Sequence, residues 1–343
     1  MICARQVFRC FRAVERFGDR VTGAAGPWFV GMAAILVSAG AFAFFEVILP
    51  TMSHPILSFF PCALIAANLG FHYYTVCTVR PGFVDDVHPV SSSPERPPEG
   101  GPGLFWAKRK GATDHMEGVR WTRALNVTPA SMSRCKKCGV VRPERAHHCR
   151  VCNRCVLKYD HHCPVRINQC VGLHNERHFV LFMAYLVLAT FFLSVCGFQK
   201  ALDALGFNFI ADWPYLTPEI LYVLIYMLSV VMCLAVGIML LWHMWGVVKG
   251  ETAVESQDHE VYRKIARSRN DNFVNSYDLG KRRNLEVFFN IGPDGYPWYT
   301  LLLPLRVPSY TDGRSWARRD GFDRHGGVVA GEELTDEEES EEP

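Results

Sequence analysis

The chain has 343 residues, enough for two or three domains, and 49% of them are hydrophobic, a high share for a soluble protein of this size. The net charge of +2 conceals an asymmetry: residues 332–343 hold eight acids and no base, so the remainder carries 36 basic against 26 acidic residues. This composition argues against an ordinary soluble enzyme. It predicts a membrane protein whose basic part suits anionic lipid or an anionic cosubstrate, followed by a self-repelling, disordered tail.

Four apolar stretches, taken in chain order, are long enough to cross a bilayer, which requires about 20 helical residues. They are residues 27–50, 55–77, 179–198 and 220–248. The first contains one acid, Glu46, and the second is the weakest because it contains Pro61, Asn68 and His72. Buried core helices are the alternative, but four nearly uncharged runs of this length favour transmembrane helices. The late start and the length of the first run argue against a cleaved signal peptide.

Lysine and arginine are distributed unevenly over the segments between these stretches. Arginines precede the first stretch, and basic residues recur in 78–178 and after 248, whereas 51–54 has none and 199–219 has only Lys200. By the positive-inside rule, both termini and the long middle loop face the cytosol. The N-terminal arginines are interleaved with apolar residues, which fits either an interfacial amphipathic helix or a simple basic flank.

The long middle loop changes character along its length. Residues 85–103 are rich in Pro, Gly and Ser and predict a flexible linker. Seven cysteines then fall within 135–170, including the Cys-x-x-Cys pairs Cys135/Cys138 and Cys149/Cys152. Four histidines lie among them: His147, His148, His161 and His162. This mixture predicts tetrahedral zinc in a reducing compartment rather than secreted disulfides, with the metal supplying the folding free energy of a short, polar segment.

Two closed sites of three cysteines and one histidine each would leave one cysteine and two histidines unused. A spare cysteine in the run Asp160-His161-His162-Cys163 has what a thiol nucleophile needs, because an imidazole can take its proton and a carboxylate can orient that imidazole. Spacing alone assigns neither the ligands of each zinc nor the spare cysteine. From the cluster alone, a purely structural zinc module used for binding remains an open alternative.

The run Asp160-His161-His162-Cys163-Pro164, placed between the second and third of four apolar stretches, resembles the DHHC palmitoyltransferases. Shorter motifs add to the resemblance and are as follows: Arg80-Pro81-Gly82 at the family's Asp-Pro-Gly, Thr252-Ala253-Val254-Glu255 at its Thr-Thr-x-Glu, and Asn275-Ser276-Tyr277-Asp278 with Asn284 and Phe288 at its C-terminal Asn/aromatic motif. Residues 151–163, 71–74 and 250–252 are most similar to the Abl-philin subgroup of the endoplasmic reticulum and Golgi. The resemblance implies an α-helical integral membrane protein with four transmembrane helices and a cytosolic cysteine-rich domain that binds two zinc ions.

The resemblance also implies a role for each residue of the cluster. One zinc would be held by Cys135, Cys138, His148 and Cys155, and the other by Cys149, Cys152, His162 and Cys170. Cys163 would be the acylated nucleophile, His161 its base and Asp160 the residue that orients His161, while His147 would not be a ligand. One departure concerns Val165-Arg166-Ile167, which replaces a Trp-x pair and lengthens the gap from Cys163 to Cys170 by one residue. It puts in question the packing beside Cys163 and the place of Cys170 among the ligands.

The activity implied by the resemblance is protein S-acylation. A palmitoyl or other long-chain acyl group would pass from acyl-CoA to Cys163 and then to cysteines of cytosolic or membrane-proximal proteins, at the lipid bilayer of the endoplasmic reticulum or Golgi. Arg142, Arg145 and Arg150 are candidate contacts for the phosphates of CoA, although solvated surface charge is the favoured interpretation of any one of them. The rival interpretations are a catalytically impaired, membrane-tethered zinc scaffold, a transporter and a nucleic-acid-binding protein. The spans show neither repeats nor enough charge for a transporter, and the cysteine and histidine spacing lacks a recognition helix.

These expectations divide the chain into seven parts. They are 1–26, a basic cytosolic N-terminus; 27–77, the first two transmembrane helices; 78–134, a linker; 135–178, the zinc domain; 179–248, the last two transmembrane helices; 249–310, a cytosolic C-terminal region; and 311–343, a disordered acidic tail.

Overall fold

A computed structural model describes residue 18 and residues 25–86, 105–107, 125–164, 167–208, 212–293 and 295–329. It contains four helices long and apolar enough to cross a membrane, which are Ala25–Thr51, α2 (Pro55–Thr78), α3 (Glu176–Cys196) and α5 (Glu219–Lys249). The first of these ends in a π-helical turn, Phe44–Ile48, and a 3₁₀ turn, Leu49–Thr51. The four predicted spans are therefore confirmed to within a few residues. Most of the basic N-terminal segment and most of the linker lie outside the described residues.

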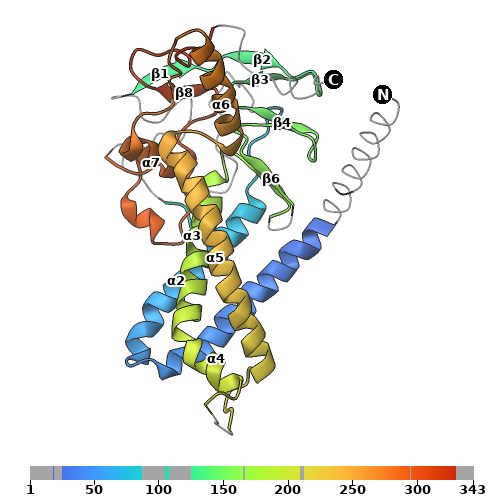
Figure 1. The fold of residues 1–343 in the computed structure, drawn as a ribbon, viewed down its shortest axis with the longest axis vertical. Helices are drawn as coiled ribbons and strands as arrows, with labels where there is room; N and C mark the ends of the chain where they lie inside the picture. Colours follow the sequence, from blue (N-terminus) through green and yellow to red (C-terminus); the bar gives the residue numbers. More distant parts are fainter. Residues whose placement is uncertain are drawn as a thin grey trace.

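The helix α3 lies between α2 and α5 and is the most buried of the four spans (Figure 1). In the most apolar part of α3, 44% of the residues are buried, against 17–22% in the corresponding parts of the other spans. The tyrosine hydroxyl of Tyr73 in α2 donates to the carbonyl of Val30 at 2.8 Å and so joins the first helix to the second. Because these helices are apolar on all sides, their remaining exposed leucines and isoleucines are the surface expected to face lipid.

The acid inside the first span has a structural partner at the end of the helices farthest from the β-strands (Figure 1). Glu46 accepts the backbone N–H of Leu216 at 2.6 Å and the hydroxyl of Thr217 at 2.7 Å. These two residues belong to the loop between the short helix α4 (Phe198–Ala204) and α5. The carboxylate therefore satisfies polar groups of a loop, which explains why a charged residue is tolerated there.

The part of the chain that carries the cysteines is built from four small antiparallel pairs of strands. They are β1 (Asn126–Pro129) with β8 (Ser315–Arg318), β2 (Met132–Arg134) with β3 (Val141–Pro143), β4 (His147–Cys149) with β5 (Arg154–Val156), and β6 (His161–Cys163) with β7 (Gln169–Val171). Two further helices, α6 (Ala253–Ser268) and α7 (Lys281–Phe289), and the 3₁₀ turn η3 (Trp298–Leu301) follow α5. Pairs of three or four residues bury little apolar surface, so they need another source of stability.

One predicted boundary is corrected by the fold. The disordered tail was expected to begin at residue 311, but residues 311–329 are folded. Within them β8 pairs with β1, and the Trp316 side chain of β8 is completely buried. These residues are folded because β8 pairs with a strand nearly 190 residues earlier in the sequence. The composition of the acidic run at 332–343 contains no sign of this pairing. Residues 330–343, which include the acidic run, lie outside the described residues.

The sequon Asn126-Val127-Thr128 provides a test of orientation. We expect no glycan on Asn126, because the loop charges predict that this segment faces the cytosol. The side-chain amide of Asn126 also donates to the carbonyls of Arg319 and Phe322, at 3.4 and 3.3 Å. The measurement is electrophoretic mobility after endoglycosidase treatment, with Asn126→Gln as the control. A shift that Asn126→Gln abolishes would reverse the predicted orientation.

Candidate functional site

The first group of candidate metal ligands joins three of the small elements. Cys135 and Cys138 come from the turn that precedes β3, and His148 of β4 lies directly opposite Cys155 of β5 in the strand register. The ligand atoms of these four residues all lie within 4.8 Å of one another. The sulfurs of Cys138 and Cys155 are 3.5 Å apart, and the Cys135 sulfur is 3.7 Å from His148 Nδ1. The group therefore forms a compact set of three thiols and one imidazole.

The second group lies beside the first and links the β4–β5 pair to the β6–β7 pair. It consists of Cys149, Cys152, His162 and Cys170, whose ligand atoms also lie within 4.8 Å of one another. His162 lies opposite Cys170 in the strand register, with 3.4 Å between Nδ1 and the sulfur, and the Cys152 and Cys170 sulfurs are also 3.4 Å apart. The structure thus brings together the two sets of four residues that the family resemblance implies.

The pleat of the strands explains why neighbouring residues belong to different groups. Successive side chains of a strand point to opposite faces. In β4, His148 therefore faces the first group while Cys149 faces the second. In β6, His162 faces the second group while His161 points away from it, toward Asp160. Alternation along two short strands thus separates the ligands of one site from those of the other and from the candidate base.

Both groups fit zinc by their donor chemistry. Each offers three soft thiols and one imidazole, which is a common set for closed structural zinc. A tetrahedron with Zn–S bonds of about 2.3 Å has sulfur–sulfur edges of about 3.8 Å, near the 3.4–3.5 Å observed. The second group also presents Nδ1 of His162 to the thiols, while the buried Nε2 of the same ring has no hydrogen-bond partner. Nδ1 is therefore the nitrogen of this ring that is placed to bind zinc together with the three thiols.

Asp160, His161 and Cys163 form a third cluster beside the second group. His161 Nδ1 lies 2.6 Å from Asp160 Oδ2, and the other carboxylate oxygen, Oδ1, accepts the backbone N–H of Ala253 at 2.8 Å. Burial lowers the pKa of His161, but hydrogen bonds to Asp160 and Cys163 outweigh it and raise that pKa to about 9. Burial raises the pKa of Asp160, but His161 more than offsets this and holds the pKa below its usual value. The cluster therefore favours an ionised Asp160 that orients His161 and increases the affinity of its imidazole for a proton.

A fourth side chain, His243, joins this cluster from α5. Its Nδ1 lies 3.8 Å from Asp160 Oδ2, and its ring centroid lies 5.5 Å from that of His161 and 5.4 Å from that of Phe179. The sequence alone assigns this histidine no role. The available signal was an ionisable residue near the end of an otherwise uncharged span, which is often functional. Its position beside the Cys/His-rich domain results from the packing of α5 against that domain, which the sequence does not show.

The flanking motifs converge on Arg145, which follows β3. The guanidinium of Arg145 donates to Glu255 Oε2 at 2.7 Å and lies 4.0 Å above the ring of Tyr277. Glu255 also closes a capping box with Thr252 at the start of α6. Arg145 was a candidate phosphate contact, with solvated surface charge as the alternative, and the structure places it in a buried ion pair instead. The Thr-x-x-Glu and Asn/aromatic motifs thus fasten the C-terminal region to the Cys/His-rich domain and hold Ala253 against Asp160.

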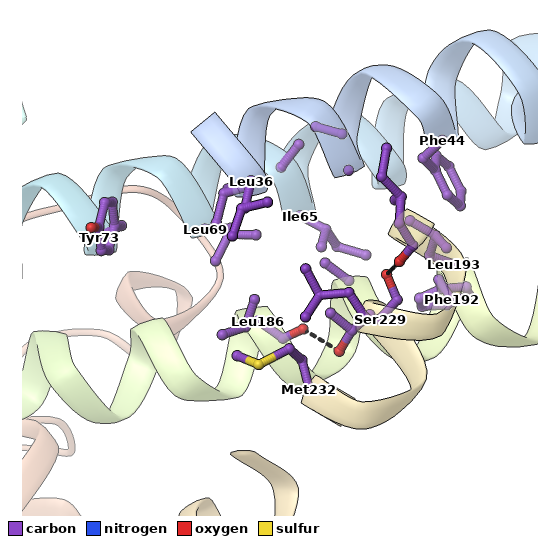
Figure 2. Close-up of a pocket in the computed structure, with 18 of the residues that line it drawn as sticks. Leu36, Phe44, Ile65, Leu69, Tyr73, Leu186, Phe192, Leu193, Ser229 and Met232 are labelled. Carbon is purple, nitrogen blue, oxygen red and sulfur yellow. Dashed lines mark hydrogen bonds between the residues drawn. The ribbon is translucent and has the colours of Figure 1, made fainter. Parts of the chain in front are cut away.

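An apolar cavity of about 190 Å³ lies between the four spans (Figure 2). Tyr73 lines one end of it, and Phe44, Phe192 and Leu193 line the other. The Cys163 side chain packs against the same apolar cluster as Leu69, Tyr73, Phe182 and Leu186, which line this cavity. The thiol therefore lies where the zinc-ligand groups meet the apolar interior of the spans.

The departure beside Cys163 has a definite place in the fold. Val165 and Arg166 lie outside the described residues, but they belong to the connection 164–168 between β6 and β7. Ile167, which follows them, is buried against the apolar cluster of the spans. Cys170 is completely buried and stands among the second set of ligands in spite of the longer connection. The extra residue therefore does not remove Cys170 from its group.

The chain is similar to known proteins that all belong to one family. The model of the DHHC palmitoyltransferase domain matches residues 129–260. "Probable protein S-acyltransferase 15" of Arabidopsis thaliana is 32% identical over 210 residues, which is 60% of this chain and 76% of that protein. "Palmitoyltransferase ZDHHC16A" of Danio rerio is 29% identical over 54% of this chain, and "Palmitoyltransferase ZDHHC15" of Xenopus laevis is 33% identical over 60% of it. These matches span 59% and 57% of the two vertebrate proteins.

The matched residues include both ligand groups, the Asp160–Cys163 run and the Thr252–Glu255 motif. The described structure has four helices long and apolar enough to cross a membrane, two before and two after the ligand groups in the chain. This chain belongs to the DHHC palmitoyltransferase family.

Proposed function

We propose that this protein is a protein S-acyltransferase that takes a palmitoyl or other long-chain acyl group from acyl-CoA onto Cys163. The acyl group then passes to cysteines of cytosolic or membrane-proximal substrate proteins. The observation that carries the proposal is the position of Cys163, which contacts the Asp160-oriented imidazole of His161 and also packs against the apolar interior of the spans. We place the protein in the membrane of the endoplasmic reticulum or Golgi, with the zinc domain and both termini in the cytosol.

The first step is acylation of the enzyme. Nδ1 of His161 is engaged by Asp160, which leaves Nε2 to take the proton of the Cys163 thiol. The thiolate attacks the thioester carbonyl, the new carbon–sulfur bond forms, and the bond to the CoA sulfur breaks. The proton held by His161 passes to the departing CoA thiolate. In the second step an acceptor cysteine attacks the Cys163 thioester in the same way, and because each step exchanges one thioester for another, no further energy source is needed.

The cavity between the spans suits the acyl chain. Removing each CH₂ from water is worth about 0.8 kcal/mol, so a long chain would anchor the cosubstrate largely by itself. Its walls come from all four spans and are almost entirely apolar, while Ser229 and Thr190, which also line it, donate their hydroxyls to backbone carbonyls of their own helices. The cavity therefore presents few unsatisfied polar groups to an alkyl chain, and the polar CoA head would remain outside the spans.

Zinc would be held by the two ligand groups and would supply folding free energy rather than take part in bond exchange. Neither group leaves an open position, since each has four protein donors. The ligand groups would keep β6 in place and thereby hold the side chains of His161 and Cys163 on the same face of that strand. A role for zinc in the reaction is not required.

The test of this function is covalent labelling of the protein itself. Purified wild type, incubated with labelled palmitoyl-CoA, should acquire a label that hydroxylamine removes. Cys163→Ser should keep its fold and zinc content but acquire none, because a serine hydroxyl is a far weaker nucleophile. Cys233→Ser, a change in α5 away from both ligand groups, is the matched control and should label like wild type. An unlabelled wild type that holds two zinc ions would instead favour an impaired zinc scaffold.

A further inference from the structure

Three buried side chains of the spans that take no part in the proposed chemistry hold the backbone of the C-terminal turn η3 and the residue after it. They donate to three successive carbonyls: Arg177 to Thr300 at 2.9 Å, Tyr185 to Leu301 at 2.7 Å, and Asn68 to Leu302 at 2.8 Å. All three donors are less than 10% exposed. A row of buried donors of this kind fixes the turn against α2 and α3.

The positions of these donors set the depth of the turn along the helices. Asn68 lies ten residues before the end of α2 at Thr78, and Tyr185 lies nine residues after the start of α3 at Glu176. At a rise of 1.5 Å per residue these are distances of about 15 and 14 Å from the helix ends near the zinc domain. The 24 residues of α2 are about 36 Å long, only about 6 Å more than a hydrocarbon core of about 30 Å. Arg177, one residue after the start of α3, reaches the same turn from nearer the zinc domain. The turn therefore lies beside the spans, between the helix ends and the positions of Asn68 and Tyr185, at the level of the nearer leaflet.

The outer face of the same turn is apolar and exposed. The exposed fractions are 68% for Trp298, 43% for Tyr299, 49% for Leu302 and 39% for Leu303. Contiguous large apolar side chains are unusual on a surface that faces water, and tryptophan and tyrosine are enriched where a membrane meets water. The apolar face and the row of donors are independent observations, and both indicate a lipid environment. Irregular backbone at membrane depth is tolerated where its carbonyls are satisfied by protein groups.

A second short segment enlarges this surface. The backbone of Arg306, soon after the turn, donates to the carbonyl of Phe105 at 2.7 Å. Phe105 is 53% exposed, and its ring lies 5.7 Å from that of Phe71 in α2. The guanidinium of Arg306 lies 4.7 Å above the ring of Trp106. An arginine stacked on an aromatic ring beside apolar residues is suited to the boundary between anionic headgroups and acyl chains.

We propose that residues 298–303, with Phe105 beside them, insert into the bilayer leaflet on the zinc-domain side as an anchor that does not span the membrane. The occupant of this surface is phospholipid, because the surface is continuous with the lipid-facing sides of α2 and α3. The anchor fixes the C-terminal region at a set height. Since the same region holds Arg145 and Asp160 through α6, the anchor also fixes the height of Cys163 above the acyl chains.

The test is photocrosslinking of the full chain reconstituted in phosphatidylcholine vesicles that contain a clickable acyl chain. Trp298→p-benzoylphenylalanine and Leu302→p-benzoylphenylalanine should form lipid adducts as abundant as those of the same replacement at Leu241, an exposed position of α5. The same replacement at Met132 in β2, which is 52% exposed against 49% for Leu302, is the matched control and should give only background. All four variants are compared only as monodisperse protein, and the readout does not depend on acyl transfer.

Two results would overturn the proposal. Lipid adducts at 298 and 302 no more abundant than those at 132 would show that the turn faces water. Adducts at 298 and 302 that join two copies of the chain, without lipid adducts, would show that the apolar face is a protein interface instead.

Discussion

Cys138→Ser and His148→Ala should each lose zinc and fail to fold stably, whereas His147→Ala should retain both ions. Cys138 and His148 belong to the first ligand group, and His147, the neighbour of His148 on the opposite face of β4, belongs to neither. A closed zinc site contributes about 10–16 kcal/mol in small metal-dependent domains, which matches or exceeds the roughly 5–15 kcal/mol by which a whole domain is stable. The measurement is zinc per chain by elemental analysis, together with the yield of monodisperse protein. Equal zinc loss in His147→Ala and His148→Ala would contradict the alternation along β4.

Cys170→Ser is the most informative variant of the second group because of the longer connection before it. Cys170 is completely buried between Cys152 and His162, so we expect the variant to lose one zinc at least. If Cys170→Ser keeps two zinc ions and wild-type thermal stability, its assignment as a ligand is wrong.

His161→Ala should keep both zinc ions and slow acylation of Cys163 by about 10²–10⁴-fold, the usual effect of removing a general base. His162→Ala should lose zinc, because its Nδ1 lies 3.4 Å from the sulfurs of both Cys152 and Cys170. The two variants remove the same side chain one residue apart, so a general effect of losing an imidazole cannot explain opposite outcomes. The measurements are the rate of labelling by acyl-CoA in a single turnover and the zinc content of the same preparations.

The contrary pattern is equally clear. If His161→Ala loses zinc while His162→Ala retains it, the roles of the two histidines are exchanged. If both variants keep zinc and label at the wild-type rate, neither the base nor the ligand assignment holds, although Cys163 could still be the acylated residue.

The four spans could be predicted because length and apolarity are local properties of the sequence. The cluster at 135–170 could be predicted as zinc-binding for a similar reason, since chelating pairs of cysteines are close in sequence. The division of its ligands between two ions could not be derived from spacing. It depends on which face of β4 and β6 each side chain occupies, and strands of three residues leave no clear pattern in sequence.

Interactions across long stretches of sequence were the ones that could not be foreseen. Arg145 was a candidate for phosphate binding or for solvated surface charge, yet it contacts the carboxylate of Glu255, which lies 110 residues further along the chain. His243 and Asp160 are also far apart in the sequence. The same is true of β1 and β8, and their pairing means that residues 315–318 belong to the fold and not to the tail. A basic residue in a sequence indicates charge alone, and whether the charge is buried depends on packing that composition does not encode.

The alternation of ligands along β4 and β6 also determines where this domain can change its length during evolution. One residue inserted between His148 and Cys149, or between His161 and His162, would turn every following side chain of that strand to the wrong face. The connection 164–168 lies beyond the paired residues Cys163 and Gln169, so a residue added there leaves the pairing of His162 with Cys170 intact. The unusual length beside Cys163 thus falls in the connection between β6 and β7, outside the paired residues that carry the ligands. We would expect length variants among related sequences to concentrate in such connections and to be absent from the strands themselves.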